Sequence, residues 1–149
     1  MPGFKAHLFG GALFFALVLT TVLWLGIYQP DQQTVLFLAV IALLSALFPD
    51  VDTDSKGRVL FYGALLLIYL TLMIQGRFRL AAVLGFCALL PAVGHHRGWT
   101  HTWWAMFLVP LPILILPMVF YERSLTSVLP FYLAAVTGYC SHLLLDRVF

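Results

Sequence analysis

Residues 6–30, AHLFGGALFFALVLTTVLWLGIYQP, form a stretch of 25 residues without a charged side chain. An α-helix that crosses the hydrocarbon core of a bilayer needs about 20 apolar residues, within a range of roughly 17–25. Five further charge-free windows follow, of 18, 18, 17, 24 and 22 residues: 32–49, 59–76, 80–96, 98–121 and 124–145. Each window is therefore long enough to span a membrane as one helix.

The composition of the chain also indicates lipid as its solvent. Of the 149 residues, 62% are hydrophobic and 9% are charged, whereas a typical soluble domain has about 25% charged residues. A soluble domain of this composition would expose apolar side chains over most of its surface, and a disordered chain needs more polar residues. Unpaired backbone amides are costly in lipid, and the alternating pattern of a barrel is missing. We therefore predict an all-α, polytopic membrane bundle, a single domain over 1–149, with six transmembrane helices at approximately 4–29, 33–49, 58–76, 79–94, 99–121 and 124–147.

The placement of the charges distinguishes the two ends of this bundle. Six helices in sequence put five Lys and Arg residues at the end where the chain starts and three at the other end, so the positive-inside rule favours a cytoplasmic location for the first end. All five histidines and four of the six acidic residues lie at that first end too: His7, His95, His96, His101, His142, Asp50, Asp52, Asp54 and Asp146. The net charge is only +2, without a basic run, which argues against a nucleic-acid partner.

The stretch 94–101, GHHRGWTH, is the most unusual polar segment of this end. The apolar run before it, 80–93, covers about 21 Å as a helix, against a hydrocarbon core of about 30 Å. We expect the histidine segment to lie below the headgroups, where polar residues are costly and usually functional. His96, Arg97 and His101 are candidate site residues, and His95 has no assigned role.

Two acidic stretches have weaker patterns. In 47–54, LFPDVDTD, an extended turn would point Asp50 and Asp52 the same way, toward one cation; the alternative is a solvated loop that caps the next helix. His142 and Asp146 are spaced i,i+4 and share a helix face; the alternative is a helix-ending aspartate paired with Arg147.

The first histidine, His7, lies in the first turns of the first helix. Gly10 and Gly11 are on the same face and allow another helix to approach closely. The alternative role for His7 is that of an interfacial histidine bonded to headgroups or water.

Together these segments predict seven nitrogen and oxygen ligands at one depth: His7, Asp50, Asp52, His96, His101, His142 and Asp146. Imidazole and carboxylate without a convergent thiolate suit zinc, manganese or iron. Seven ligands exceed one tetrahedral site, which favours two ions with a bridging aspartate. Arg97 would hold a phosphate or another anion, and Asp54 is the candidate general base.

The same residues carry a family resemblance. The early His7, the segments LFPDVDT (47–53), HRGWTH (96–101) and SHLLLD (141–146), in this order over nearly the whole chain, resemble the YdjM-like membrane-bound metal-dependent hydrolases of bacteria and archaea. That family is distantly similar to zinc-dependent phospholipase C, which builds a zinc cluster from His and Asp. The resemblance implies a multi-pass protein of the prokaryotic inner membrane that hydrolyses a phosphoester, or another ester, of a lipid-linked substrate.

Two other functions remain open from the sequence. A metal-ion transporter or metal-sensing membrane protein would use the same ligands, although transporters usually bind near the midplane on broken helices from internal repeats. Pro110, Pro112 and Pro117 interrupt the fifth window and keep this alternative open. Haem held by a histidine pair would need histidines that face each other.

Overall fold

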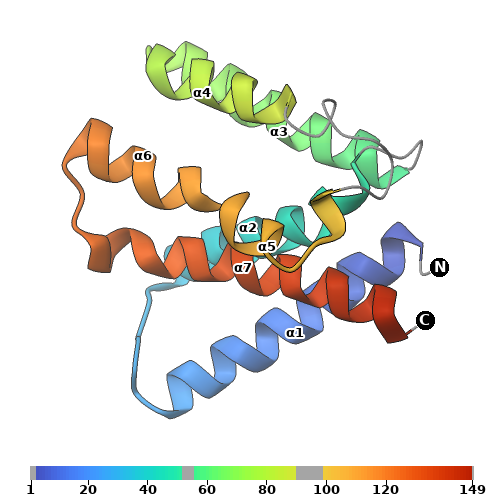
Figure 1. Cartoon of the computed structure of the whole chain (residues 1–149). Coiled ribbons are helices and arrows are strands. Elements are labelled where there is room, and N and C mark those ends of the chain that lie inside the picture. The colour runs from blue at the N-terminus through green and yellow to red at the C-terminus, as the bar shows by residue number, and fades with distance from the viewer. Residues whose placement is uncertain (1–2, 52–55, 90–98, 149) are drawn as a thin grey trace.

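The computed structural model describes residues 3–51, 56–89 and 99–148, and its regular elements there are all helical (Figure 1). This confirms the predicted all-α class. In chain order the elements are α1 (Phe4–Trp24), α2 (Gln32–Leu47), the short 3-10 turn η1 (Phe48–Asp50), α3 (Lys56–Ile74), α4 (Phe78–Leu89), the 3-10 turn η3 (Trp99–His101), α5 (Ala105–Leu108), α6 (Leu111–Tyr121) and α7 (Leu125–Val148).

Four segments of the described chain are long and apolar enough to cross a membrane: Phe4–Trp24, Gln32–Asp50, Lys56–Ile74 and Leu125–Arg147. The first helix is shorter than the predicted 4–29. Gly26 has the positive φ of +67° that glycine adopts without strain, and the amides of Gly26 and Ile27 bond back to Leu23 and Val22. These bonds end α1 at Trp24.

The other two predicted spans differ more from the structure. α4 has 12 residues, and the end of the predicted span 79–94 lies outside the described residues. The predicted single helix 99–121 is divided into η3, α5 and α6, with the last break at Val109 and Pro110. Proline has no backbone N–H and its ring clashes with the preceding turn, so the helical hydrogen bonds are interrupted there.

Small residues set the tightest packing, between α7 and α2. A Cβ atom on Gly138 would lie 1.9 Å from the carbonyl oxygen of Ala42, so only glycine fits. On α1, a Cβ on Gly11 would lie 2.8 Å from the Cβ of Ala46. The close helix contact predicted at Gly11 is thus confirmed, and α7 packs against both α1 and α2 (Figure 1).

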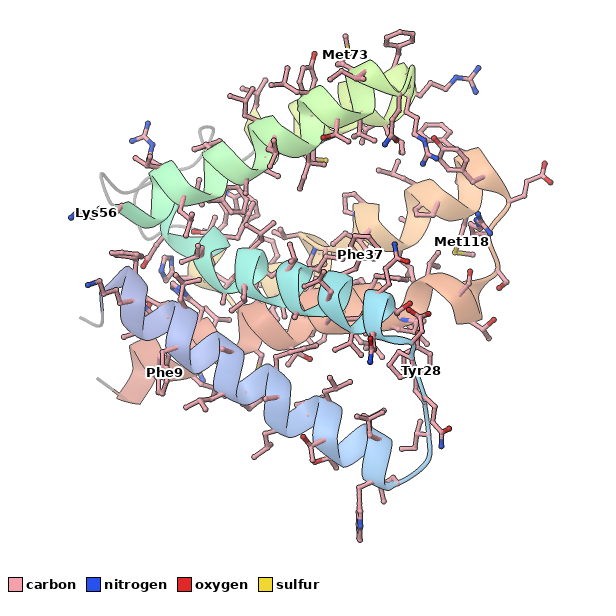
Figure 2. The ribbon with its side chains drawn as sticks, turned by 180° about the vertical axis from the view of Figure 1, so that it is seen from behind. Phe9, Tyr28, Phe37, Lys56, Met73 and Met118 are labelled. Carbon is pink, nitrogen blue, oxygen red and sulfur yellow. The ribbon has the colours of Figure 1, made fainter. Side chains whose placement is uncertain are left out.

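The outer surface is apolar, as expected for helices in lipid. Large side chains such as Trp24, Ile74 and Phe9 are 84%, 87% and 66% exposed, and Figure 2 shows Phe9 and Phe37 on the outside of α1 and α2. Soluble monomers rarely expose an apolar surface of this extent.

Asp31, directly before α2, caps this helix. Its side chain accepts a hydrogen bond from the Thr34 amide at 2.9 Å. This hydrogen bond lowers the pKa of the Asp31 carboxyl.

The main buried cluster lies at the end of the bundle where the chain begins and ends. It joins α2, η1, α3, α5 and α7 through six residues: Leu47, Phe48, Val51, Phe61, Ala105 and Tyr139. The N-terminus of α1 and the C-terminus of α7 lie at this same end (Figure 1). The cluster therefore packs η1 against α3 and α7, and Trp99 of η3 packs against the cluster.

Candidate metal centre

Five of the predicted ligands converge at this end of the bundle. Asp50, His101, His142 and Asp146 each offer an atom within 4.8 Å of the others. His7 joins them, because its Nε2 lies 3.6 Å from Asp50 Oδ2 and 3.5 Å from Asp146 Oδ1. The other candidates, Asp52, Asp54, His96 and Arg97, and the unassigned His95, lie outside the described residues. Neither cysteine belongs to the group in the described part of the chain.

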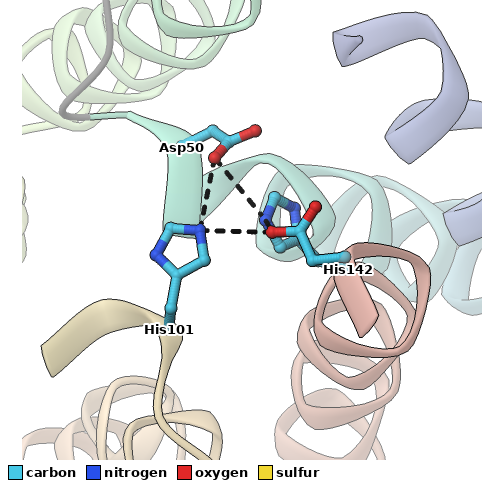
Figure 3. A group of neighbouring side chains, drawn as sticks. Asp50, His101 and His142 are labelled. Carbon is cyan, nitrogen blue, oxygen red and sulfur yellow. Dashed lines mark ion pairs between the residues drawn. The ribbon is translucent and has the colours of Figure 1, made fainter. Parts of the chain in front are cut away.

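The separations within the group are those of atoms that share an ion. His101 Nε2 lies 3.4 Å from both Asp50 Oδ1 and Asp146 Oδ2, and His142 Nε2 lies 3.3 Å from Asp146 Oδ2 and 3.7 Å from Asp50 Oδ1 (Figure 3). Direct charge-assisted hydrogen bonds are shorter, about 2.7–2.9 Å. Two ligands of a tetrahedral zinc ion, each about 2.0–2.1 Å from it, are roughly 3.3 Å apart. The donor types and the shortest of these separations therefore fit a bound metal.

The ring of His142 has a defined tautomer. Its Nδ1 lies 2.8 Å from the carbonyl oxygen of Ala46, and a carbonyl only accepts, so Nδ1 carries the proton and donates. In the neutral ring the lone pair of Nε2 then points toward two carboxylates, which repel it unless a cation lies between them. Nε2 is buried and has no hydrogen-bond partner among the described residues. A carbonyl that holds the far nitrogen of a histidine is the usual support of a metal ligand.

His7 is the second buried imidazole of the group. Its side chain is 1% exposed, and neither ring nitrogen has a hydrogen-bond partner within the described chain. Its ring stacks on that of His142, with 3.9 Å between the centroids. Buried polar atoms are nearly always hydrogen-bonded, so an Nε2 without a hydrogen-bond partner that faces Asp50 and Asp146 supports a cation site here.

The helix packing explains why these side chains meet. Gly138 lets α7 approach α2 so closely that His142, one turn later, reaches the Ala46 carbonyl. Asp146, a further turn along, lies on the same face. The 3-10 turn at Pro49 ends α2 and places Asp50 beside these two residues.

Two residues of the site were missed by the sequence analysis. The Tyr139 hydroxyl, fully buried, donates to the Thr100 carbonyl, and Thr100 Oγ1 donates to the Pro49 carbonyl at 3.4 Å. Thr100 Oγ1 also lies 3.3 Å from Nδ1 of His101. These contacts join α7, η3 and η1 behind the ligands. The only signal in the sequence was position, since Thr100 directly precedes His101 and Tyr139 lies three residues before His142.

Replacing Tyr139 with phenylalanine is expected to weaken metal binding by roughly ten-fold or more, because loss of a partner behind the ligands loosens their placement. The lost buried hydrogen bond should also lower the free energy of unfolding by about 1 kcal/mol. Competition with a chelator measures the affinity. Tyr132→Phe is the matched control, since Tyr132 donates to the Phe107 carbonyl from the same helix, away from the site. Equal affinities for the two variants would contradict a role for Tyr139 in the site.

Comparison with known proteins gives one match. The family model described as YdjM inner membrane protein matches residues 1–148 of the chain. Searches of curated proteins and of solved structures found no match. The family match agrees with the apolar spans of the structure and covers all the residues of the candidate site.

Proposed function

The chain belongs to the YdjM inner membrane protein family, and from the geometry of its polar centre we propose that it is a membrane-embedded, metal-dependent hydrolase. The observation that supports this most is the pair of buried imidazoles, His7 and His142, whose Nε2 atoms face Asp50 and Asp146 without a hydrogen-bond partner among the described residues. The proposed substrate is a lipid-linked phosphoester, or another ester, whose headgroup lies at the depth of the centre.

The carboxylates of Asp50 and Asp146 divide their oxygens between two groups of histidines. Asp50 Oδ1 and Asp146 Oδ2 face His101 and His142, while Asp50 Oδ2 and Asp146 Oδ1 face His7. Asp50 and Asp146 would therefore help to hold two ions, one beside His101 and His142 and the other beside His7. With Asp50 and Asp146, His101 and His142 would give one ion four ligands. With the same two aspartates, His7 would give the other ion three ligands.

The second, less complete group leaves room for other ligands or for substrate. Asp52 and His96, which the sequence predicts as further ligands, would add to the five residues described. Zinc suits the imidazole and carboxylate donors best, with manganese and iron as alternatives.

Each residue has a separate part in the proposed reaction. A divalent metal held by these residues would supply Lewis-acid chemistry toward water and toward a phosphoryl or carbonyl oxygen. Arg97 would orient the anionic headgroup through paired N–H donors, and Asp54 would accept the proton of the attacking water. The Ala46 carbonyl holds His142 in the tautomer whose Nε2 is free of a proton. The excess of Lys and Arg at this end favours a cytoplasmic site.

A hydrolysis screen in nanodiscs tests the proposal. Phosphatidic acid and phospholipids should release phosphate or a phosphorylated headgroup in the presence of zinc or manganese, and a chelator should stop the release. Asp50→Asn is expected to lower turnover by roughly 1,000-fold or more, because it removes a negative ligand from both groups of histidines. Asp31→Asn is the matched control, since asparagine also caps a helix and Asp31 lies at the other end of α2.

Equal turnover in wild type and Asp50→Asn would overturn the proposal. So would metal flux through proteoliposomes that is lost in Asp50→Asn while no lipid is hydrolysed. This second result would favour the transporter, for which the interrupted helix α5–α6 is the supporting feature.

A further inference from the structure

A cavity of about 350 Å³ lies between α2, α3, α4, α6 and α7. Its volume falls in the range of small-molecule sites, about 300–1,000 Å³. The walls are almost wholly aliphatic and aromatic, for example Leu65 and Ile68 of α3, Leu84 of α4 and Leu116 of α6. Of the few polar atoms near it, the Tyr139 hydroxyl is already bonded to the Thr100 carbonyl. Such walls suit a hydrocarbon and offer little to a polar ligand.

The cavity is elongated and runs along the bundle. On α3 its lining extends from Phe61 to Leu72, which is about 16 Å along a helix axis. Leu80 and Pro117 line the far part, near the loops that join α3 to α4 and α6 to α7. The cavity therefore covers about half of a hydrocarbon core of roughly 30 Å.

The near end of the cavity is lined by two residues that stand close to the metal ligands in the chain. Phe48 and Tyr139 line it there, and they lie two residues before Asp50 and three residues before His142. The same two aromatic residues belong to the buried cluster that supports the ligands. A molecule with its tail in the cavity would thus have its polar end beside the polar centre.

Four of the helices that line the cavity form two hairpins. α4 packs mainly against α3, and α6 packs mainly against α7, so the two helical hairpins form opposite walls of the cavity (Figure 1). α3 and α7 are long and apolar enough to cross a membrane, and α4 and α6 belong to shorter apolar helices. A hydrocarbon chain of the bilayer would therefore reach the cavity between the two hairpins.

We propose that this cavity binds one hydrocarbon chain of a phosphate-bearing lipid, with the headgroup at the metal centre. The inference deepens the proposed function and rests on it for the identity of the headgroup. The hydrocarbon tail would lie among α3, α4 and α6. The cavity would therefore be the part of the site that favours an amphiphile over a water-soluble phosphoester.

Photocrosslinking tests the assignment with phosphatidic acid that carries a diazirine near the end of one acyl chain. The wild-type protein in nanodiscs is used, because the labelled acyl chain stays on the glycerol whether or not the phosphate has been released. Crosslinks should map by peptide mass spectrometry to cavity residues of α3, α4 and α6. Leu84→Trp and Leu116→Trp should reduce these crosslinks by roughly ten-fold, since an indole fills the volume that the chain needs.

The controls are Phe86→Trp and Val119→Trp, on the same two helices, where the native side chains are 68% and 65% exposed. They should leave the cavity crosslinks unchanged, and unfolding temperatures of all four variants identify any loss of folding. Crosslinks spread evenly over the outer surface, or insensitive to Leu84→Trp and Leu116→Trp, would overturn the inference, as would crosslinks that bridge two copies of the chain through the cavity. Cavity crosslinks in a protein that hydrolyses no lipid would support the tail site while the hydrolase proposal fails.

Discussion

The Gly138→Ala variant is expected to lose about 3 kcal/mol of unfolding free energy, a large effect for a single methyl group. The added Cβ would lie 1.9 Å from the carbonyl oxygen of Ala42 and 2.7 Å from its carbonyl carbon. Both atoms are backbone, so no side-chain rotation relieves the overlap, and α7 must move away from α2. His142 would then lose its contact with the Ala46 carbonyl, and metal affinity should fall together with stability.

Thermal unfolding in detergent, followed with and without zinc, measures both effects. Gly63→Ala is the matched control, because Gly63 lies inside α3 with nothing within 4 Å of an added Cβ. Alanine there should leave stability unchanged or slightly higher, since it lowers the entropy cost of the helix. A Gly138→Ala protein with the unfolding temperature and metal affinity of wild type would contradict the account of α2–α7 packing.

Asp146→Asn is expected to weaken the binding of both proposed ions by roughly 100-fold or more. This loss is larger than that for a residue which only supports a ligand, about 10–100-fold. The reason is that the two oxygens of Asp146 face different histidines, Oδ1 toward His7 and Oδ2 toward His101 and His142. His7→Ala should remove only the ion on its own side. Titration with zinc in competition with a chelator, analysed for two sites, distinguishes these outcomes.

The control for the charge change is again Asp31→Asn, which should bind both ions as wild type does. If His7→Ala and Asp146→Asn lost the same single ion, the division of the carboxylate oxygens between two ions would be wrong. Wild-type affinity in Asp146→Asn would remove this residue from the centre.

Most of the fold prediction came from the hydropathy of the sequence and from the positions of its charged residues. Charge-free windows predict helices well because lipid selects against charges over a whole span. They report poorly on where a helix ends or breaks, since that depends on single residues. Gly26 ends α1 early through a left-handed turn, and Pro110 divides the fifth predicted helix although its neighbours are apolar.

The convergence of the ligands was predictable because helix order fixes which ends of the helices share a membrane face. His7 and His142 are far apart in the chain and stack in the structure. The supporting contacts were not predictable, because the bond from Tyr139 to Thr100 depends on how α7 and η3 pack. The apolar cavity was missed for the same reason, as it arises from the placement of two helical hairpins.

The metal-to-protein ratio of the purified protein shows directly whether the chain binds metal ions at the proposed centre. Wild type, His142→Ala and Cys140→Ala are loaded with zinc, freed of excess and analysed by mass spectrometry of the metal. We expect two ions per chain in wild type, a loss of at least one ion in His142→Ala and no loss in Cys140→Ala, since the Cys140 thiol is not among the converging ligands. Wild type without bound metal, or the same ratio in His142→Ala as in wild type, would contradict the account.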